Sequence, residues 1–185
     1  MARIEVIKYT NAQGQLKDIY DDLISKRGKL SNVLSIQSLK PSSILTHIEL
    51  YMDIMFAKSE LSRAEREMMA VVVSVANECS YCQIHHAEAV QHYWKDETKL
   101  VQLKTDFTQA NLTDRELALC SYAKELTKNP GNAQEEDITL LLKNEGLSDA
   151  AILDASLVVS YFNFVNRMVL SLGVKLEEDA GGYKY

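Results

Sequence analysis

Residues 61–76 read LSRAEREMMAVVVSVA, and this stretch decides between a helical and a β-containing fold. Its valines at 71–73 and 75 are β-branched and would suit a strand. Ser62 followed by Glu65, however, is a capping box, the pattern that opens a helix. The apolar run is also long for a strand, and no other segment is a strand candidate. The stretch therefore predicts a buried helix and an all-α protein.

The rest of the chain supports this prediction. Its 185 residues include only 7 glycines and 2 prolines, and 46% are hydrophobic, so long helices around a core are expected. Apolar spacing and cap residues predict helices over residues 12–25, 41–58, 62–76, 79–94, 100–107 and 134–144, another that opens at the Thr113 and Glu116 capping box, and a long last helix that opens at Ser148. We expect a compact bundle of about seven to nine helices in a single domain over residues 1–185, with an N-terminal arm (1–11) and a flexible tail (177–185).

Charge and composition restrict the classes of partner that the protein can be expected to bind. The net charge of −6 and the isoelectric point near 5.3 argue against a nucleic-acid partner, which requires a basic surface. No run of about 18 uncharged apolar residues is present, so we expect no membrane span. The first residues lack the pattern of a secretory signal, which makes a cytoplasmic location the expectation. In a reducing compartment, a CxxC pair is more often catalytic or metal-binding than a structural disulfide.

Residues 79–86 read CSYCQIHH and hold two of the three cysteines and two of the four histidines. Cys82 and His86 are four apart, so they share one face of a helix. A thiol beside an imidazole can be held as the thiolate, and a second thiol three residues away can capture the oxidised sulfur as a disulfide. A helix that begins after a break at Asn77 would stabilise the thiolate further through its N-terminal dipole. The segment predicts a thiol redox centre, with His86 or His85 as proton acceptor.

A carboxylate could orient that imidazole and raise its basicity. Glu67 is the best placed in sequence, at the edge of the apolar run. Its position in the first turn of the predicted helix fits equally well a solvated glutamate that stabilises the helix dipole. Both interpretations stay open at the level of sequence.

The two cysteines have three other possible roles: zinc ligands, a static disulfide or inert buried thiols. A zinc site could use Cys79, Cys82 and a histidine, with Cys120 or His92 as fourth ligand, but the second tight ligand pair of structural zinc sites is missing. The expected compartment disfavours a static disulfide. Inert buried cysteines are common, yet they have no reason to keep CxxC spacing with a histidine one turn later.

The pattern of Glu67, eleven intervening residues, Cys79-x-x-Cys82 and, after three more, His86 resembles the signature of the AhpD-like alkylhydroperoxidases in the carboxymuconolactone decarboxylase superfamily. The resemblance runs from about residue 12 to residue 174. Several motifs are similar in particular to the peroxidase-related branch: Asn77-x-Cys79-x-Tyr81-Cys82-x-x-His85-His86, Ser38-Leu39-Lys40-Pro41, Gly146-Leu147-Ser148-Asp149, Asn163-x-x-Asn166-Arg167 and Leu172-Gly173-Val174. It implies an AhpD-like helical bundle, a homo-oligomer, and a dihydrolipoyl carrier or similar external dithiol as reductant.

One residue departs from the family pattern. In the best-known AhpD proteins, a histidine of the proton relay precedes the second cysteine, whereas this chain has Tyr81. A phenol with a reference pKa of about 10 is a poor base near neutral pH. The resemblance therefore implies four site residues that match the family signature directly: Cys79, Cys82, His86 and Glu67. Two further residues, His85 and Tyr81, are possible members of the relay.

Polar residues also interrupt the last helix. Asn163, Asn166 and Arg167 must find partners if that helix is buried. For Arg167 we expect mainly a structural role, bonded to helix termini or to interior carboxylates such as Glu67, with a place in the pocket as the alternative.

These residues predict a thiol-dependent peroxidase that needs no metal or bound organic cofactor. Cys82 would attack a hydroperoxide, hydrogen peroxide or a disulfide, and Cys79 would resolve the product. The reverse assignment stays open because the first cysteine of a helix-terminal CxxC is often the more acidic. The alternatives are a redox-sensing or disulfide-exchange protein with little turnover, and an enzyme of the carboxymuconolactone decarboxylase type, against which the thiol pair counts.

Overall fold

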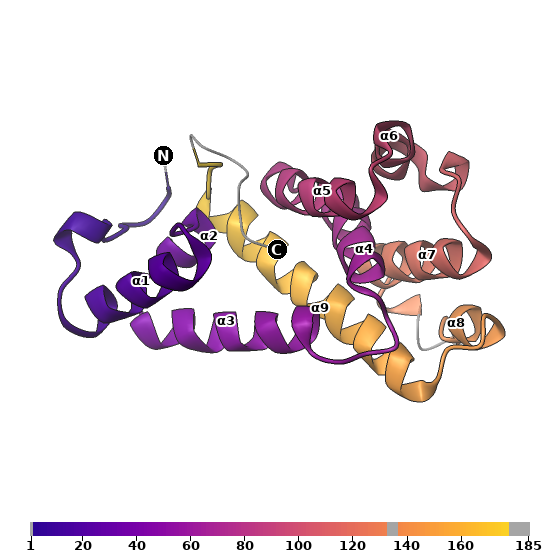
Figure 1. Ribbon diagram of the computed structural model, residues 1–185, viewed down its shortest axis with the longest axis horizontal. Helices are drawn as coiled ribbons and strands as arrows, with labels where there is room; N and C mark the ends of the chain where they lie inside the picture. The colour runs from indigo at the N-terminus through magenta and orange to yellow at the C-terminus, as the bar shows by residue number, and fades with distance from the viewer. Residues whose placement is uncertain (1, 133–136, 178–185) are drawn as a thin grey trace.

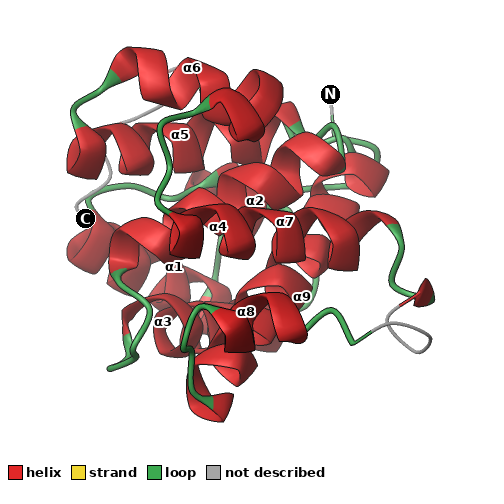
Figure 2. Ribbon diagram, turned by 90° about the vertical axis from the view of Figure 1, so that its right-hand side faces the viewer, coloured by secondary structure: helices red, strands yellow, loops and turns green. Residues whose placement is uncertain are grey.

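The computed structural model describes residues 2–132 and 137–177, and every regular element in these two ranges is a helix (Figures 1 and 2). In chain order they are the 3-10 helix η1 (Tyr9–Asn11), α1 (Gly14–Arg27), α2 (Asn32–Ser35), α3 (Pro41–Phe56), α4 (Arg63–Ala76), α5 (Ser80–Trp94), α6 (Glu97–Asp106), η2 (Phe107–Gln109), α7 (Asp114–Lys128), α8 (Leu140–Asn144) and α9 (Asp149–Leu172). The predicted all-α class and number of helices are confirmed. Of the helix expected over 134–144, residues 134–136 lie outside the described residues, and α8 begins only at Leu140.

Helix α4 is the centre of the bundle, and it is a buried helix, as its sequence predicted. Its capping box is formed: the Glu65 amide donates to Ser62 Oγ over 3.1 Å, and the Ser62 amide donates to Glu65 Oε2 over 2.6 Å. Residues 68–73 are all buried, because α5, α7 and α9 pack around α4. Neighbouring helices cover this valine run on every side, so it can be buried without forming a strand. Residues 71–75 are therefore helical, although their β-branched side chains would also suit a strand.

Helix α9 crosses the molecule diagonally between two groups of helices (Figure 1). It begins at Ser148, whose hydroxyl accepts from the Ala151 amide over 3.2 Å. Among the described residues, α9 is the one helix long and apolar enough to cross a membrane by length and composition alone, with 44% of its most apolar 18-residue window buried. The core helix of a bundle has the same composition, and contacts with α3, α4 and α7 account for it here.

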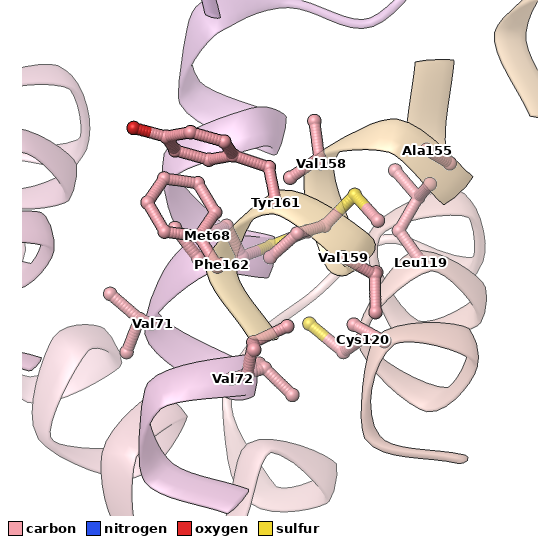
Figure 3. Close-up of a cluster of buried hydrophobic side chains, with 14 of the residues drawn as sticks. Met68, Val71, Val72, Leu119, Cys120, Ala155, Val158, Val159, Tyr161 and Phe162 are labelled. Atoms are coloured by element: carbon pink, nitrogen blue, oxygen red, sulfur yellow. The ribbon is translucent and has the colours of Figure 1, made fainter. Parts of the chain in front are cut away.

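The apolar side chains form two clusters. The larger one joins α4, α5, α7 and α9 and contains Cys120, whose side chain lies between α7 and α9 near Val159 (Figure 3). The smaller one joins α1, α2 and α3 around Tyr20 and Ile44. The protein therefore has a main bundle and an N-terminal unit, α1–α3, which is attached to it along α3 and α9.

Both expected terminal segments are bonded to the fold where the structure describes them. In the N-terminal arm, the Arg3 guanidinium donates to the carbonyls of Leu170 and Ser171 over 2.7 and 2.8 Å. At the first position of the segment expected to be a flexible tail, the Glu177 carboxylate accepts hydrogen bonds from α2 and α5. Residues 178–185 lie outside the described residues.

We expect Leu119→Ala to lower the free energy of unfolding by about 2–5 kcal/mol, because it empties a fully buried site between α4, α7 and α9. Leu117→Ala, in the same helix but 36% exposed, is the matched control and should cost well under half as much. Urea unfolding with an unchanged m-value measures both. Equal losses in the two variants would contradict this description of the core.

Candidate active site

The corner between α4 and α5 sets the position of the cysteines. After Asn77, Glu78 adopts a left-handed conformation with φ +57°. The Cys79 amide donates to the Ser74 carbonyl over 2.9 Å and the Glu78 amide to the Val75 carbonyl over 3.0 Å, which is the Schellman arrangement at a helix end. A non-glycine residue is strained in this conformation. The break predicted at Asn77 is present, and it makes Cys79 the N-cap residue of α5.

The two thiols are reduced and buried, with exposures of 0% for Cys79 and 2% for Cys82. A hydrogen bond from the Cys82 side chain, aided by the backbone amides of Cys82 and Tyr81, lowers the pKa of Cys79 to about 7. The hydrogen bond to Cys79, burial and the charge on Cys79 together raise the pKa of Cys82 well above its ordinary value. In the resting pair, the negative charge therefore resides on Cys79.

Glu67 is completely buried and lies at the centre of the first polar network, which we call the Glu67 network. Its Oε1 accepts from Arg63 Nε over 2.8 Å and Nη2 over 2.5 Å, and its Oε2 accepts from His86 Nδ1 over 2.6 Å. Burial raises the pKa of Glu67, but His86 and Arg63 outweigh it and lower the pKa overall. The carboxylate is thus an anion that fixes the proton of His86 on Nδ1, which leaves Nε2 for proton exchange.

The alternative of a solvated glutamate at position 67 is excluded by this burial. Sequence reasoning did not identify Arg63, one turn before Glu67, as a site residue. The i, i+4 spacing of the two opposite charges is the signal that could have found it. Its Nη1 also donates to the Met55 carbonyl over 3.0 Å, which ties α4 to α3.

Asn166 is a site residue whose place could not be read from the sequence. It is fully buried on α9, and its side chain forms a hydrogen bond with Cys82 that lowers the pKa of that thiol. Its Oδ1 accepts from Asn77 Nδ2 over 3.2 Å, and the same Asn77 nitrogen donates to Asn163 Oδ1 over 2.9 Å. Arg167 does not approach Glu67: it is exposed and donates to Asn163 Oδ1 over 2.6 Å.

Tyr81 and His85 belong to a second network, the Glu177 network, rather than to the first. Tyr81 Oη donates to Glu177 Oε1 over 2.8 Å, and His85 Nε2 lies 3.0 Å from Glu177 Oε2. The Asn32 amide donates to Glu177 Oε1 over 2.6 Å. Burial alone would raise the pKa of Glu177, but these hydrogen bonds lower it to about 2. Distance along the chain, 92 residues between His85 and Glu177, hid this pairing.

A cavity of about 100 Å³ lies between the N-terminal unit and the main bundle. The N-terminal unit lines it with Arg27, Ser31, Val33, Leu34, His47, Ile48, Tyr51 and Phe56. The main bundle lines it with Glu67, Tyr81, Cys82, His85, His86, Tyr161, Phe162 and Val165. Cys82 and His86 therefore face the same space as the buried carboxylate, whereas Cys79 is not part of the cavity wall.

The cavity wall also holds a polar pair, His47 and Tyr161, which the sequence did not reveal. His47 Nε2 lies 2.7 Å from Tyr161 Oη, and its Nδ1 lies 2.7 Å from Gln37 Nε2. Burial lowers the pKa of His47 to about 4, so the ring is neutral at pH 7. The Tyr161 hydroxyl is thereby held in a fixed position on the cavity wall.

Among the described residues, no group of three or more His, Cys, Asp or Glu side chains is arranged to hold a metal ion. Cys120, a possible fourth ligand of the zinc alternative, lies in the apolar core, where burial raises its pKa.

Comparisons with known proteins bear on the family and the fold. Residues 45–125, from α3 to α7, match the model of the carboxymuconolactone decarboxylase family. The fold is similar to that of two uncharacterized peroxidase-related proteins. The protein from Silicibacter sp. TM1040 is 26% identical, with a TM-score of 0.85 over 98% of this chain and 94% of that one. The protein from Ralstonia eutropha JMP134, described as an alkylhydroperoxidase AhpD core, is 22% identical, with a TM-score of 0.85 over 96% and 93%.

The debrominase Bmp8 has a similar fold at 17% identity, with a TM-score of 0.77 over 94% of this chain and 91% of that one. No curated protein is significantly similar in sequence. The resemblance to the carboxymuconolactone decarboxylase superfamily and its AhpD-like, peroxidase-related branch, predicted from the motifs, is confirmed.

We expect the thiolate absorbance of the reduced protein near 240 nm to rise with a midpoint near pH 7, because Cys79 ionises there. Cys82→Ala should move this midpoint upward by about one pH unit or more, since it removes the hydrogen bond that stabilises the Cys79 thiolate. Cys82→Ser keeps a hydroxyl donor and should move it less. A midpoint that is identical in all three proteins would contradict the assignment.

Glu177→Gln should destabilise the protein at neutral pH, with an effect that fades in acid. The pKa of Glu177 in the folded state lies below its ordinary value of 4.5, so the carboxylate stabilises the fold above pH 4.5 and loses this contribution as the pH falls toward 2. Urea unfolding at pH 7, 5, 4 and 3 measures the difference from the wild type. The exposed Glu145→Gln is the control and should show little difference at any pH. A difference for Glu177→Gln that does not shrink between pH 5 and 3 would refute this role.

Proposed function

We propose, on the premise that residues 45–125 form a carboxymuconolactone decarboxylase family segment within an AhpD-like fold, that the protein is a thiol-dependent peroxidase. One observation carries the proposal: Cys82, His86 and the buried Glu67 face one small cavity, with a second thiol one turn behind the first. The expected cytoplasmic location, homo-oligomer and dithiol carrier are part of this proposal.

Access to the cavity supports Cys82 as the attacking thiol, and the lower pKa of Cys79 supports its role as the resolving thiolate. A substrate in the cavity meets Cys82, because Cys79 is not exposed to that space. Cys82 transfers its proton to His86 Nε2, while Glu67 stabilises the imidazolium. The Cys82 thiolate then attacks the terminal oxygen of the hydroperoxide, so that the S–O bond forms and the O–O bond breaks. The leaving alkoxide takes the proton back from His86, and the products are the sulfenic acid and an alcohol.

The second step closes the disulfide. The Cys79 thiol, with a pKa of about 7, ionises near neutral pH, and its thiolate attacks the Cys82 sulfenic acid. The S–S bond forms, the S–O bond breaks, and the released hydroxide is protonated to water. An external dithiol, such as a dihydrolipoyl group on a carrier protein, then reduces the Cys79–Cys82 disulfide by thiol exchange and is itself oxidised to a disulfide.

The size of the cavity restricts the substrate. An engineered apolar cavity of about 150 Å³ holds benzene, and this one is smaller, at about 100 Å³. A hydroperoxide of a few carbon atoms fits, and a long acyl chain does not fit unless the N-terminal unit moves. The aromatic and aliphatic wall favours an organic hydroperoxide over hydrogen peroxide, which has no apolar surface to bury.

The burial of both sulfurs favours one second candidate, a dithiol protein that senses oxidation and turns over little. Slow entry of oxidant would give oxidation in minutes without sustained consumption of peroxide. Steady-state turnover with excess dithiol separates the two functions, since a sensor forms the disulfide once and stops.

Cys82→Ser should abolish the consumption of a small alkyl hydroperoxide in the presence of dihydrolipoamide. Cys79→Ser should allow a single turnover and leave a sulfenic acid on Cys82 that dimedone labels, as mass spectrometry would detect. Cys120→Ser is the control and should keep full activity, because Cys120 lies in the core. Sustained turnover by Cys82→Ser would eliminate this mechanism.

Glu67→Gln should lower the rate of peroxide consumption by about 10²-fold, since it removes the anion that makes His86 an effective base. The control is Glu65→Gln in the preceding turn, which keeps a side chain able to accept the capping hydrogen bond and leaves the Glu67 network intact. A Glu67→Gln variant with wild-type turnover would show that the carboxylate does not act through His86.

A further inference from the structure

The cavity wall contains one cation that no carboxylate neutralises. Arg63 is not this cation, because it is bound to Glu67 through two nitrogens. Arg27 also lines the cavity, but among the described residues no carboxylate forms an ion pair with it. Arg27 contacts Met52 Sδ, 3.8 Å from Nη1, and the Tyr51 ring, whose centroid is 5.3 Å from Cζ.

The fold holds this guanidinium beside the cavity. Arg27 is the last residue of α1, which Gly28 ends in a left-handed conformation with φ +84°, and the Gly28 amide donates to the Ile24 carbonyl over 2.9 Å. Helix α1 packs on α3, which supplies the Tyr51 ring under Arg27. The charge acts inside the cavity: it opposes the rise in pKa that burial causes for Tyr51 and Tyr161 on the cavity wall.

The other charged groups around the cavity are already satisfied. Glu67 is shared by Arg63 and His86, and the Glu177 carboxylate, which is not part of the cavity wall, accepts from Tyr81, His85 and the Asn32 amide. His47 is neutral at pH 7. Among the described residues, a molecule that enters the cavity therefore meets one positive charge without a carboxylate partner, Arg27, on the wall formed by the N-terminal unit.

We propose that Arg27 selects substrates that carry a carboxylate, so that the preferred substrate is a small carboxylate-bearing hydroperoxide. The planar guanidinium can bind a carboxylate through two parallel hydrogen bonds, while the peroxide end lies toward Cys82 on the opposite wall. A small cavity favours a short carboxylic acid over a bulky anion such as a nucleotide. The choice of peroxide rests on the proposed function; the binding of the anion does not.

Two alkylating reagents of nearly the same size test the binding of an anion without any peroxidase reaction. Iodoacetate is anionic and iodoacetamide is neutral, and both modify thiolates. The measured quantity is the ratio of their rates at the Cys79/Cys82 pair, located by mass spectrometry, in the wild type and its variants. Arg27→Gln should lower the iodoacetate-to-iodoacetamide ratio by about tenfold, the size of one charge-assisted contact.

Two control variants isolate the position of the charge. Arg27→Lys keeps the charge and should retain most of the ratio. Lys26→Gln removes a charge from the adjacent exposed position, where Lys26 pairs with Asp22 over 2.9 Å, and should leave the ratio unchanged. In the wild type alone, added salt should slow iodoacetate more than it slows iodoacetamide. An unchanged ratio in Arg27→Gln, an equal fall in Lys26→Gln, or equal salt effects on the two reagents would overturn the proposal.

A second measurement separates this inference from the proposed function. With a short hydroperoxy carboxylic acid and its methyl ester as substrates, Arg27→Gln should raise KM for the acid by about tenfold and leave KM for the ester unchanged. If both peroxides are consumed and Arg27→Gln changes neither KM, the selection of carboxylates by Arg27 is refuted and the peroxidase function stands. A shifted alkylation ratio without consumption of either peroxide would keep the anion site and refute the peroxidase.

Discussion

The buried carboxylate of Glu67 is the interaction on which the site depends. An ion without solvent is tolerated only when partners surround it, and here Arg63 and His86 bind both oxygens. Arg63 comes from the preceding turn of α4, whereas His86 comes from α5, so the Glu67–His86 hydrogen bond joins these two helices. The strained corner at Glu78 then places Cys79 at the N-terminus of α5, with Cys82 and His86 on the face that meets the cavity.

The residues proposed to react and the residue proposed to select the substrate come from different parts of the chain around the cavity. Every residue to which we assign a step of the reaction lies within the segment that matches the carboxymuconolactone decarboxylase family, residues 45–125. Arg27 and Glu177 lie outside that segment, one in the N-terminal unit and one after α9. The same reacting groups can therefore serve different substrates when the segments around them change, as is common when sites are carried on a shared fold.

Tyr81 illustrates how a departure from a family pattern is accommodated. It replaces a histidine of the relay, and the fold gives it another partner, Glu177, which also binds His85. Helix α5 thus presents two imidazoles to one cavity, from adjacent positions 85 and 86, and each is paired with a different carboxylate. The Glu67 pair lies inside the bundle, and the Glu177 pair joins α5 to α2 and the end of the chain.

The sequence alone determined the features that depend on neighbouring residues. Caps at Ser62, Thr113 and Ser148, together with the spacing of apolar residues, specify the helices, because helix signals act within a few residues. The spacing of Glu67, Cys79, Cys82 and His86 identified the family for the same reason. Only the tertiary structure decided which groups meet across helices: Glu177 with His85, Asn166 with Cys82, and Arg27 with the cavity. The first two contacts join residues 84 or more positions apart, and Arg27 is 55 positions from Cys82. No local pattern encodes them, because they arise only when packing of the core brings the N-terminal unit and α9 against α5.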